Sequence, residues 1–404
     1  MIIRTSLVVL TAVLAACSSD SSESGHSFRV FEENGITVAE TLGGPKYEGE
    51  LFEYEQILTL KEDVENPDSF LFRAFEFWMD EDDYIYVADS GNNRIAVFDP
   101  EGNYVRQFGR EGEGPGEFRS LRIQSLDDGV ISIWDSRLRR ATLYRTDGTY
   151  LETITPLQER SLTGLQRDEN ANLFIFFAFG SVQDGYHVIG NGIRVYSASG
   201  DTLCEVITPA IITSFTIQTD DAFGTATVPY CGKPEALLLR SGEILISTGM
   251  EPRIALYNLS GEIVREVRVD LEVQPITDTE KRATQSRMRQ DAEKDPNEQN
   301  RAFDRAMAES VKYPDHKAFW TLIHEDSDGY MWLSWSTNPY NRSEEVHYRL
   351  LSPEGEYLGE TVTPTTSGQF QQGRYLTRIN NEETGQRVPT IFSIRPIAAG
   401  LKYP

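Results

Sequence analysis

The 404-residue chain has few cysteines, few histidines and few positive charges. It contains 3 Cys and 5 His, and its 38 Lys and Arg are outnumbered by 63 Asp and Glu, which gives a net charge of −25. Proteins that bind nucleic acid contact the phosphates through clustered Lys and Arg, so this balance argues against a nucleic-acid partner. No internal segment approaches the roughly 18 consecutive apolar residues of a membrane-spanning helix, so none is predicted in the mature chain.

Motifs for catalysis and metal binding are also lacking. G-x-S-x-G and H-E-x-x-H are absent, and no Cys/His pair has the sequence context of a nucleophile and its base. His316 and His324 have no histidine partner at i+4, and His26 lies in a polar segment. The residues alone therefore assign no catalytic group, no metal ligand and no cofactor.

One glycine-rich stretch, GREGEGPGEF at residues 109–118, raises the question of a phosphate-binding loop. Such a loop needs free backbone N–H groups at a helix N-terminus and usually a Lys. Here Pro115 removes a donor, three glutamates add negative charge, and no helical pattern follows. We therefore interpret the stretch as a connection between structural units.

The first residues have the features of a targeting signal. Arg4 precedes a short apolar run over residues 6–16, which predicts a signal peptide at residues 1–16. The run ends in Leu-Ala-Ala-Cys17, which resembles the lipobox of bacterial lipoproteins. That resemblance implies a lipid on Cys17 and an anchored protein in the bacterial cell envelope. The alternative is an ordinary secretory signal with a chance Cys.

A polar segment follows the predicted lipidation site. Residues 18–27 contain six Ser, and we expect residues 17–34 to form the lipidated Cys and a flexible tether. Ser18 takes the place of the Asp that favours inner-membrane retention in bacterial lipoproteins. The resemblance thus implies the outer membrane, with the protein facing the periplasm or the exterior and the lipid as its only membrane contact.

The rest of the chain repeats. Residues 80–109 align with residues 125–154 at a constant offset of 46, which places Asp89 on Asp135 and Arg94 on Arg140. A third copy lies at 251–269, and weaker copies lie at 193–207 and 326–362. Each copy combines apolar alternating runs with Pro- and Gly-containing turns, as expected for short strands. A period near 45 residues with several strands per unit is typical of a β-propeller.

Two sets of residues carry a resemblance to known families. The sequence YVADSGNNRIAVFDPEGNYVRQFGREGEGPGEF is similar to an NHL repeat. The stretches YPDHKAFWTLIHEDSDGYMWLSW and LSPEGEYLGETVTP resemble six-bladed β-propeller lipoproteins of bacteria. The resemblance implies an all-β fold over residues 35–404, with six four-stranded blades.

The blades are predicted at about 70–109, 118–156, 162–209, 234–270 and 316–363, and the last blade combines 374–381 and 389–397 with 53–60. In that last blade, the N-terminal strand would close the ring on the C-terminal strands and remove the exposed sheet edge.

Residues 277–312 break the repeat. They are highly charged, lack strand-like runs and contain Pro296. Thr277 or Asp278 can cap a helix, with Glu280 following, so the sequence predicts a helical insertion of two helices. It would be either a solvated decoration or a lid over one mouth of the propeller. We expect the irregular excursion at 208–233 to lie over the same face.

Cys204 and Cys231 flank that excursion and are the only cysteines left once Cys17 is lipidated. An even count in an oxidising compartment predicts a disulfide between them, and the alternative is two buried thiols. Asp89 and Asp135 occupy the same position in two copies of the repeat. We therefore expect them to hold turns in place and not to bind metal. The same structural role is expected of Arg94 and Arg140.

The candidate ligand-binding residues are polar or aromatic side chains on the predicted inner strands, which lead to the channel of the ring. They are Arg73, Glu76, Arg122, Gln124, Arg167, Trp320 and His324. Trp320 and His324 are expected on one face of a strand beside the insertion. The alternative is that these polar groups pair internally between blades.

We therefore expect a monomeric binding or scaffold module that recognises a protein, peptide or glycan at one face of the propeller. The alternative is a metal-dependent enzyme. Some related six-bladed propellers are calcium-dependent hydrolases, lactonase-like enzymes or lyases, whose metal is held by Asp, Asn and Glu of inner strands. Calcium is the one cofactor that this resemblance allows. Only Glu76 stands out here as an acidic member, and no complete ligand set can be named.

Overall fold

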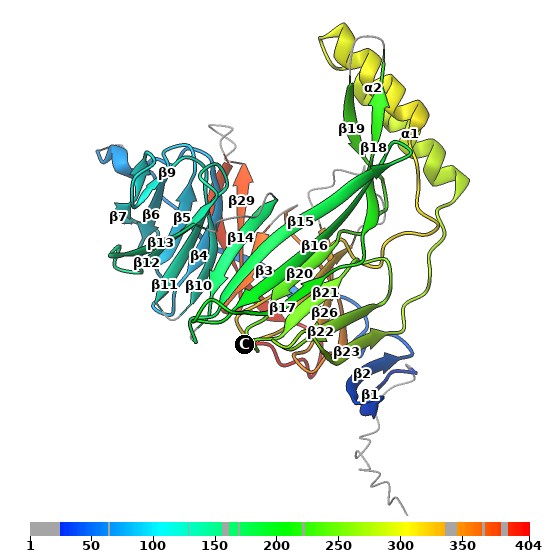
Figure 1. Ribbon diagram of the computed structural model, residues 1–404, viewed down its shortest axis with the longest axis horizontal. Coiled ribbons are helices and arrows are strands. Elements are labelled where there is room, and N and C mark those ends of the chain that lie inside the picture. Colours follow the sequence, from blue (N-terminus) through cyan, green and yellow to red (C-terminus); the bar gives the residue numbers. More distant parts are fainter. Residues whose placement is uncertain are drawn as a thin grey trace, which may run out of the picture.

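Strands dominate the structure, a computed structural model that describes residues 25–63, 65–127, 129–155, 161–168, 170–219, 223–335, 346–365, 368–380 and 387–404. Six sheets stand around a ring (Figure 1). The first three blades are β4 (Ala74–Met79), β5 (Ile85–Asp89), β6 (Arg94–Phe98) and β7 (Tyr104–Phe108); β10 (Leu121–Asp127), β11 (Val130–Asp135), β12 (Arg140–Arg145) and β13 (Tyr150–Ile154); and β14 (Leu162–Arg167), β15 (Leu173–Gln183), β16 (Tyr186–Tyr196) and β17 (Thr202–Ile207).

The next two blades have the same order, with the first strand nearest the ring axis. Blade four is β20 (Glu235–Leu238), β21 (Ile244–Ser247), β22 (Arg253–Tyr257) and β23 (Ile263–Val269), and blade five is β24 (Leu322–Glu325), β25 (Met331–Trp335), β26 (Val346–Leu351) and β27 (Tyr357–Thr363). Blade six consists of β28 (Gly368–Gln371), β29 (Arg374–Asn380), β30 (Arg387–Pro396) and the N-terminal β3 (Phe52–Thr59). The chain is a six-bladed β-propeller, as the repeat predicted.

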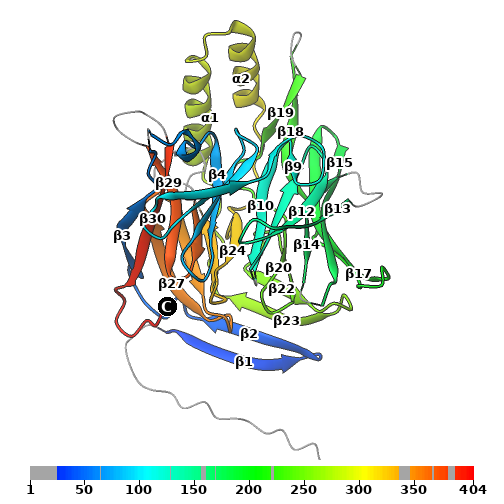
Figure 2. The ribbon, with the colours of Figure 1, turned by 90° about the vertical axis from the view of Figure 1, so that its left-hand side faces the viewer.

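The N-terminal strand closes the ring. β3 pairs antiparallel with β30, from Phe52 opposite Pro396 to Thr59 opposite Thr390 (Figure 2). This pairing joins the two ends of the chain in one blade and covers the sheet edge that β30 would otherwise expose. The predicted closure, with residues 53–60 as the outer strand, is confirmed.

The repeated Asp residues hold the blade connections to the strands. Asp89 is fully buried and accepts hydrogen bonds from Phe72 N (2.8 Å), Asn92 Nδ2 (2.7 Å) and Arg94 Nε (2.9 Å). Asp135 is equally buried, and it accepts from backbone N–H groups on both sides of its turn, at Arg119, Ser120, Arg137 and Leu138. The structural interpretation of both residues is correct.

The glycine-rich stretch 109–118 is an interblade connection. It contains the short parallel pair β8 (Arg110–Glu111) and β9 (Glu117–Phe118), and Arg140 donates to the carbonyls of Glu113, Gly114 and Glu117. At Gly109, φ is 79°, and a Cβ would lie 2.5 Å from the buried Phe118 ring. Glycine is needed there for the close packing of the connection on the blade.

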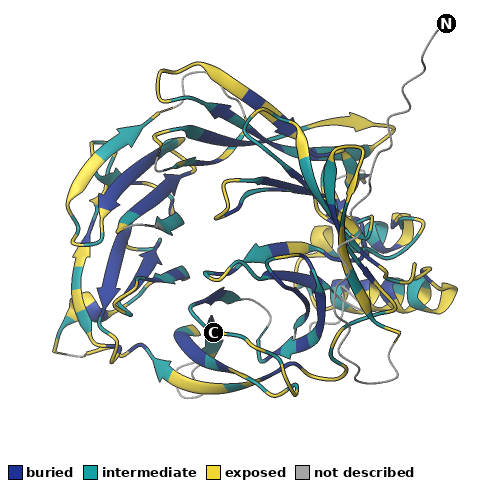
Figure 3. Cartoon of the chain, turned by 90° about the horizontal axis from the view of Figure 1, so that it is seen from below, coloured by how far each residue is buried: buried dark blue, intermediate teal, exposed yellow. Residues whose placement is uncertain are grey.

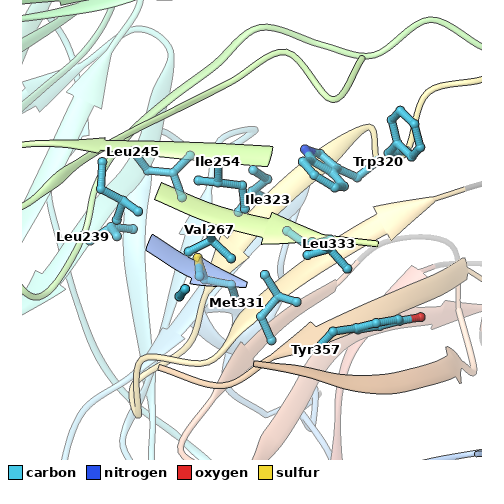
Figure 4. Packing of buried hydrophobic residues seen from close by; sticks show 14 residues of the cluster. Leu239, Leu245, Ile254, Val267, Trp320, Ile323, Met331, Leu333 and Tyr357 are labelled. Atoms are coloured by element: carbon cyan, nitrogen blue, oxygen red, sulfur yellow. The ribbon is translucent and has the colours of Figure 1, made fainter. Parts of the chain in front are cut away.

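Packing between neighbouring blades forms the core. Between blades four and five, Leu245, Ile254 and Val267 meet Met331 and Leu333, all fully buried or nearly so (Figure 4). In blade one the second and third strands are entirely buried, whereas the outer strands of the ring mix exposed, half-buried and buried positions (Figure 3). Face-to-face sheet packing of this kind accounts for the alternating apolar pattern of the repeats.

Part of the predicted tether is a strand. β1 (Ser27–Glu33) and β2 (Ile36–Leu42) form a hairpin, and β2 pairs in parallel with β23, so blade four has six strands. The prediction that residues 17–34 are a flexible tether is therefore wrong from Ser27 onward. Asn34 and Gly35, both with positive φ, form the turn, and Asn-Gly is a strong hairpin signal. Val38 and Ala39 of β2 are buried.

The excursion and the insertion are ordered. The excursion forms the hairpin β18 (Ile211–Gln218) and β19 (Phe223–Thr227), and β18 pairs with the extended end of β16. The insertion consists of α1 (Asp278–Ala292) and α2 (Glu298–Ser310). Thr277 and Glu280 form a capping box at the start of α1, and Asn297 caps α2, so the predicted pair of helices around Pro296 is confirmed.

Replacing Asp89 with Ala should destabilise the protein by about 3 kcal/mol, because it removes three hydrogen bonds and leaves the buried Arg94 without its carboxylate. Denaturant unfolding of the variant would measure the change. Asp82→Ala, an exposed residue in the first turn of the same blade, is the matched control and should change the unfolding free energy by less than about 0.5 kcal/mol. Equal effects of the two substitutions would contradict the role given to Asp89.

Candidate ligand-binding site

The inner strands of all six blades begin at the same end of the ring, here called the upper end, because the interblade connections enter there. The tip of the β15–β16 hairpin, β18–β19 and the helices lie at this end, and β1–β2 lies at the opposite, lower end (Figure 1). The residues that the chain adds to the repeat are thus concentrated at one end, where a propeller ligand would enter.

Helices and hairpin share one hydrophobic core, and we call this unit, residues 208–233 with 277–312, the wall. Phe215 and Ile217 of β18 pack with Met288 of α1 and Ala308 of α2. Tyr230 and Thr284 bring their hydroxyls to 3.4 Å across the same contact. The expectation that the two segments lie together at one end is confirmed. The lid hypothesis needs correction, since the helices stand at the periphery of the ring and not over its centre (Figure 3).

The first strands of blades one, two and three each contain one irregularity in their pairing. The pairing register shifts next to Glu76 in β4, at Gln124 in β10 and at Thr163 in β14. β-Bulges redirect side chains and are frequent beside binding and catalytic sites. The predicted residues Glu76, Arg122 and Gln124 therefore lie at a structural feature that three adjacent blades share.

These side chains are in contact from blade to blade. The Arg122 guanidinium donates a hydrogen bond to Thr163 O in blade three. Gln124 lies so close to Gly164 that a Cβ there would come within 2.4 Å of Gln124 Oε1. Burial raises the pKa of Glu76 above its usual range, and the charge of Arg122 and the backbone N–H of Ile123 oppose that shift. Glu76 is thus a partly desolvated acid beside a positive charge.

Several buried polar atoms on the inner strands of blades six, one and two have no hydrogen-bond partner. They are Glu76 Oε2, Trp78 Nε1, Gln124 Oε1, Gln369 Oε1 and Gln371 Nε2. We call these five residues together with Arg122 the inner-strand cluster. Buried polar atoms in proteins are almost always satisfied by protein, water or ligand. The unpaired atoms are therefore available to ordered water or to a ligand.

Blade six is tied into the cluster through Gln371. Its Oε1 accepts from Met79 N of blade one at 2.9 Å, which leaves the Nε2 group free. Gln369 and Gln371 are two residues apart on β28, so they share one face of that strand. The sequence analysis did not select these glutamines, because β28 is only four residues long and lacks the repeat pattern.

Other predicted site residues have structural or peripheral positions. Trp320 is 1% exposed and its Nε1 donates to Ser247 Oγ at 2.9 Å, so the prediction of an exposed aromatic anchor is wrong. His324 Nε2 lies 3.0 Å from Phe370 O in blade six, and burial lowers the pKa of this histidine. Arg167 pairs with Glu152 near the lower end. Arg73 lies at the upper end, with its guanidinium over the Phe72 ring.

The predicted disulfide is not formed. Cys204 is buried between blades three and four, whereas the Cys231 thiol donates to Ile212 O at the base of the wall. Burial raises the pKa of both thiols, to about 11 for Cys231. The two cysteines therefore belong to different cores. Of the two buried thiols that the alternative describes, Cys204 is buried, whereas Cys231 is half-buried.

Two further acids on inner strands were not foreseen. Glu235 begins β20, and burial raises its pKa to about 7 against the weak opposition of Lys233. Glu325 ends β24 and accepts from Arg240 N at 2.8 Å, and burial raises its pKa to about 7 as well. In the described ranges, no group of three or more His, Cys, Asp and Glu is arranged to hold a metal ion.

With this geometry, the chain can be placed by class. It is a six-bladed β-propeller, and residues 63–193 match the family model DUF5128, described as a 6-bladed β-propeller. No curated protein matches the chain. No helix in the described part of the chain is long and apolar enough to cross a membrane.

Solved structures resemble the chain only distantly. They include a proposed exported protein of Bacteroides fragilis (13% identity, TM-score 0.48, covering 86% of this chain and 95% of that one). A Bacteroides vulgatus member of the DUF4221 family is 12% identical (TM-score 0.46, 86% and 99% coverage). Virginiamycin B lyase of Staphylococcus aureus is 12% identical (TM-score 0.36, 87% and 90% coverage). Likeness at this level carries no information on activity.

Glu235→Gln should stabilise the protein at high pH. Because the folded-state pKa of about 7 lies above the usual 4.5, ionisation is disfavoured in the fold and the unfolding free energy falls as pH rises through this window. The variant should therefore gain roughly 3 kcal/mol at pH 8 and almost nothing at pH 4. Chemical unfolding at both pH values tests this, with exposed Glu101→Gln as control. A gain of the same size at both pH values would rule out the desolvated carboxylate as the cause.

Proposed function

We propose that the chain is a lipid-anchored envelope binding module that holds a polar ligand along its inner strands, with the entrance at the upper end of the propeller. The observation that carries this proposal is the inner-strand cluster, in which unpaired polar atoms gather on adjacent strands beside a row of bulges. Ligand sites typically combine a preformed hollow with a few convergent polar groups, which a ligand satisfies when it binds.

Side-chain types indicate the ligand class. Arg122 supplies a cation, Glu76 an acid, the glutamines both donors and acceptors, and Trp78 an aromatic surface with one donor. Such a mixture suits hydroxyl and amide groups, so the ligand is a glycan or a peptide. The wall forms one side of the entrance and supplies the loop-borne surface on which specificity usually depends.

A lipid anchor on Cys17 would determine which end of the propeller faces the membrane. Nine residues, 18–26, separate Cys17 from β1, and they can span at most about 30 Å. Since β1–β2 lies at the lower end, a lipid on Cys17 would turn that end toward the membrane and the entrance away from it (Figure 1). A ligand could then be presented from solution or from a neighbouring envelope component.

The double substitution Arg122→Ala and Gln124→Ala should weaken ligand binding by at least about tenfold, because it removes a charged and a neutral hydrogen-bonding group. Ligands would first be selected by screening the purified mature chain on glycan and peptide arrays, and affinities measured by calorimetry. Arg167→Ala, on a neighbouring inner strand but paired near the lower end, is the control. Unchanged affinity in the double variant would place the ligand elsewhere, and a stoichiometric calcium ion in the purified protein would favour the enzyme alternative.

Cys17→Ala should release the protein from the membrane fraction into the soluble envelope fraction. Thioether attachment of lipid needs the Cys17 sulfur, and a single Ala leaves the preceding apolar run intact. Fractionation followed by immunoblotting would measure the change, with Ser18→Ala as the matched control. Full membrane retention of the Cys17→Ala variant would refute the anchor.

A further inference from the structure

A hollow lies away from the inner-strand cluster, at the seam where blade six meets blade one. It has a volume of about 320 Å³, and its lining comes from three parts of the chain. These are the segment after β3, the segment that contains the 3₁₀ turn η1 (Pro67–Ser69) and leads into β4, and the strands β29 and β30. A volume of this size is at the lower end of the range for small-molecule sites and holds roughly ten non-hydrogen atoms.

The lining is positive, although the protein is strongly acidic. It contains Lys61, Arg73, Arg378 and Arg387 but only one acid, Glu62. Arg387 lies diagonal to Arg378 across β29 and β30, since Arg378 faces Pro389 and Asn380 faces Arg387. Diagonal neighbours share one face of the sheet, and like charges so placed repel. Burial and the charge of Arg387 together lower the pKa of Arg378.

Among the described residues, three of these four cations form no ion pair with a carboxylate. Within the described ranges, no carboxylate lies within 4.0 Å of the charged nitrogens of Lys61, Arg73 or Arg387. Lys61 Nζ reaches only the Asn103 side-chain oxygen, at 3.4 Å, and the Arg73 guanidinium lies 5.5 Å from the Phe72 ring centroid.

Arginines elsewhere on the same two strands are paired. Arg374 of β29 bonds to Asp83, and Arg395 of β30 bonds to Glu53. Both of these ion pairs lie away from the end of the strands that borders the hollow. Cations that lie close together around a partly enclosed space repel one another, which costs free energy. A bound anion would offset that cost.

The remaining lining is apolar and includes Leu71, Phe72, Val388 and Pro389. Phe72 is 58% exposed, which is unusual for a large aromatic side chain and leaves its ring available for contact. Arg73 has a φ of 61°, a left-handed conformation that a side chain other than Gly adopts only at an energetic cost. We propose that this hollow binds a small amphipathic anion, with a carboxylate or phosphate head on the cations and a short hydrocarbon body on the apolar lining.

Calorimetry and thermal shift with octanoate, octyl phosphate and neutral 1-octanol test this proposal on the mature wild-type chain. At least one of the two anions should bind at least tenfold more tightly than octanol and raise the melting temperature. Whichever anion binds more tightly identifies the head group. If neither binds below its micelle concentration, or if octanol binds equally well, the proposal is wrong.

Variants locate the site. Arg387→Gln and Arg73→Gln should each weaken the anion at least fivefold, whereas Arg395→Gln, at the other end of β30, should not. Arg73 and Arg387 lie in different segments of the chain. If one variant fails to fold, the other still tests the proposal. Equal binding by wild type and both variants would overturn the assignment. Arg122→Ala should leave this binding unchanged, which keeps the result separate from that of the inner-strand cluster.

Discussion

Pairing of β3 with β30 is the contact on which the rest of the structure depends. A ring of six sheets can leave no exposed edge in its last blade only if a strand from the other end of the chain completes it. Here the eight residues of β3 do so over a pairing that runs from Phe52 to Thr59. The contact between blades six and one, including the hydrogen bond from Met79 N to Gln371, requires that the ring be closed.

In the closed ring, the repeated residues stabilise the connections between strands. The side chains of the inner strands can therefore differ from blade to blade. Asp89 and Asp135 fix the turns in almost the same way, although the side chains on the inner strands differ. Glu76 and Arg122 are 46 residues apart, the offset of the repeat, so equivalent positions of neighbouring blades carry opposite charges. The framework thus repeats, whereas the inner-strand cluster breaks its symmetry, as a specific site must.

Much of the fold could be predicted from sequence because its determinants are local or periodic. The turn residues and the capping pair Thr277 and Glu280 act within a few residues of themselves, and the repeated Asp residues act within or next to their own blade. The failures concern contacts between distant segments. Trp320 is buried because its indole meets Ser247, 73 residues earlier in the chain. The serine-rich sequence before β1 led to the prediction of a flexible tether there, although Asn34-Gly35 indicates a hairpin turn.

Ring closure and the positive hollow share the same residues, and this links two properties of the molecule. Leu60 continues the closing strand and donates its N–H to Pro389 O, and both residues line the hollow. The cations of blade six and the segment before β4 lie on opposite sides of that seam, so their mutual repulsion opposes closure. An anion between them would offset the repulsion and contact both sides. Because the closed ring presents this arrangement and an open chain does not, binding there must favour the closed ring by mass action.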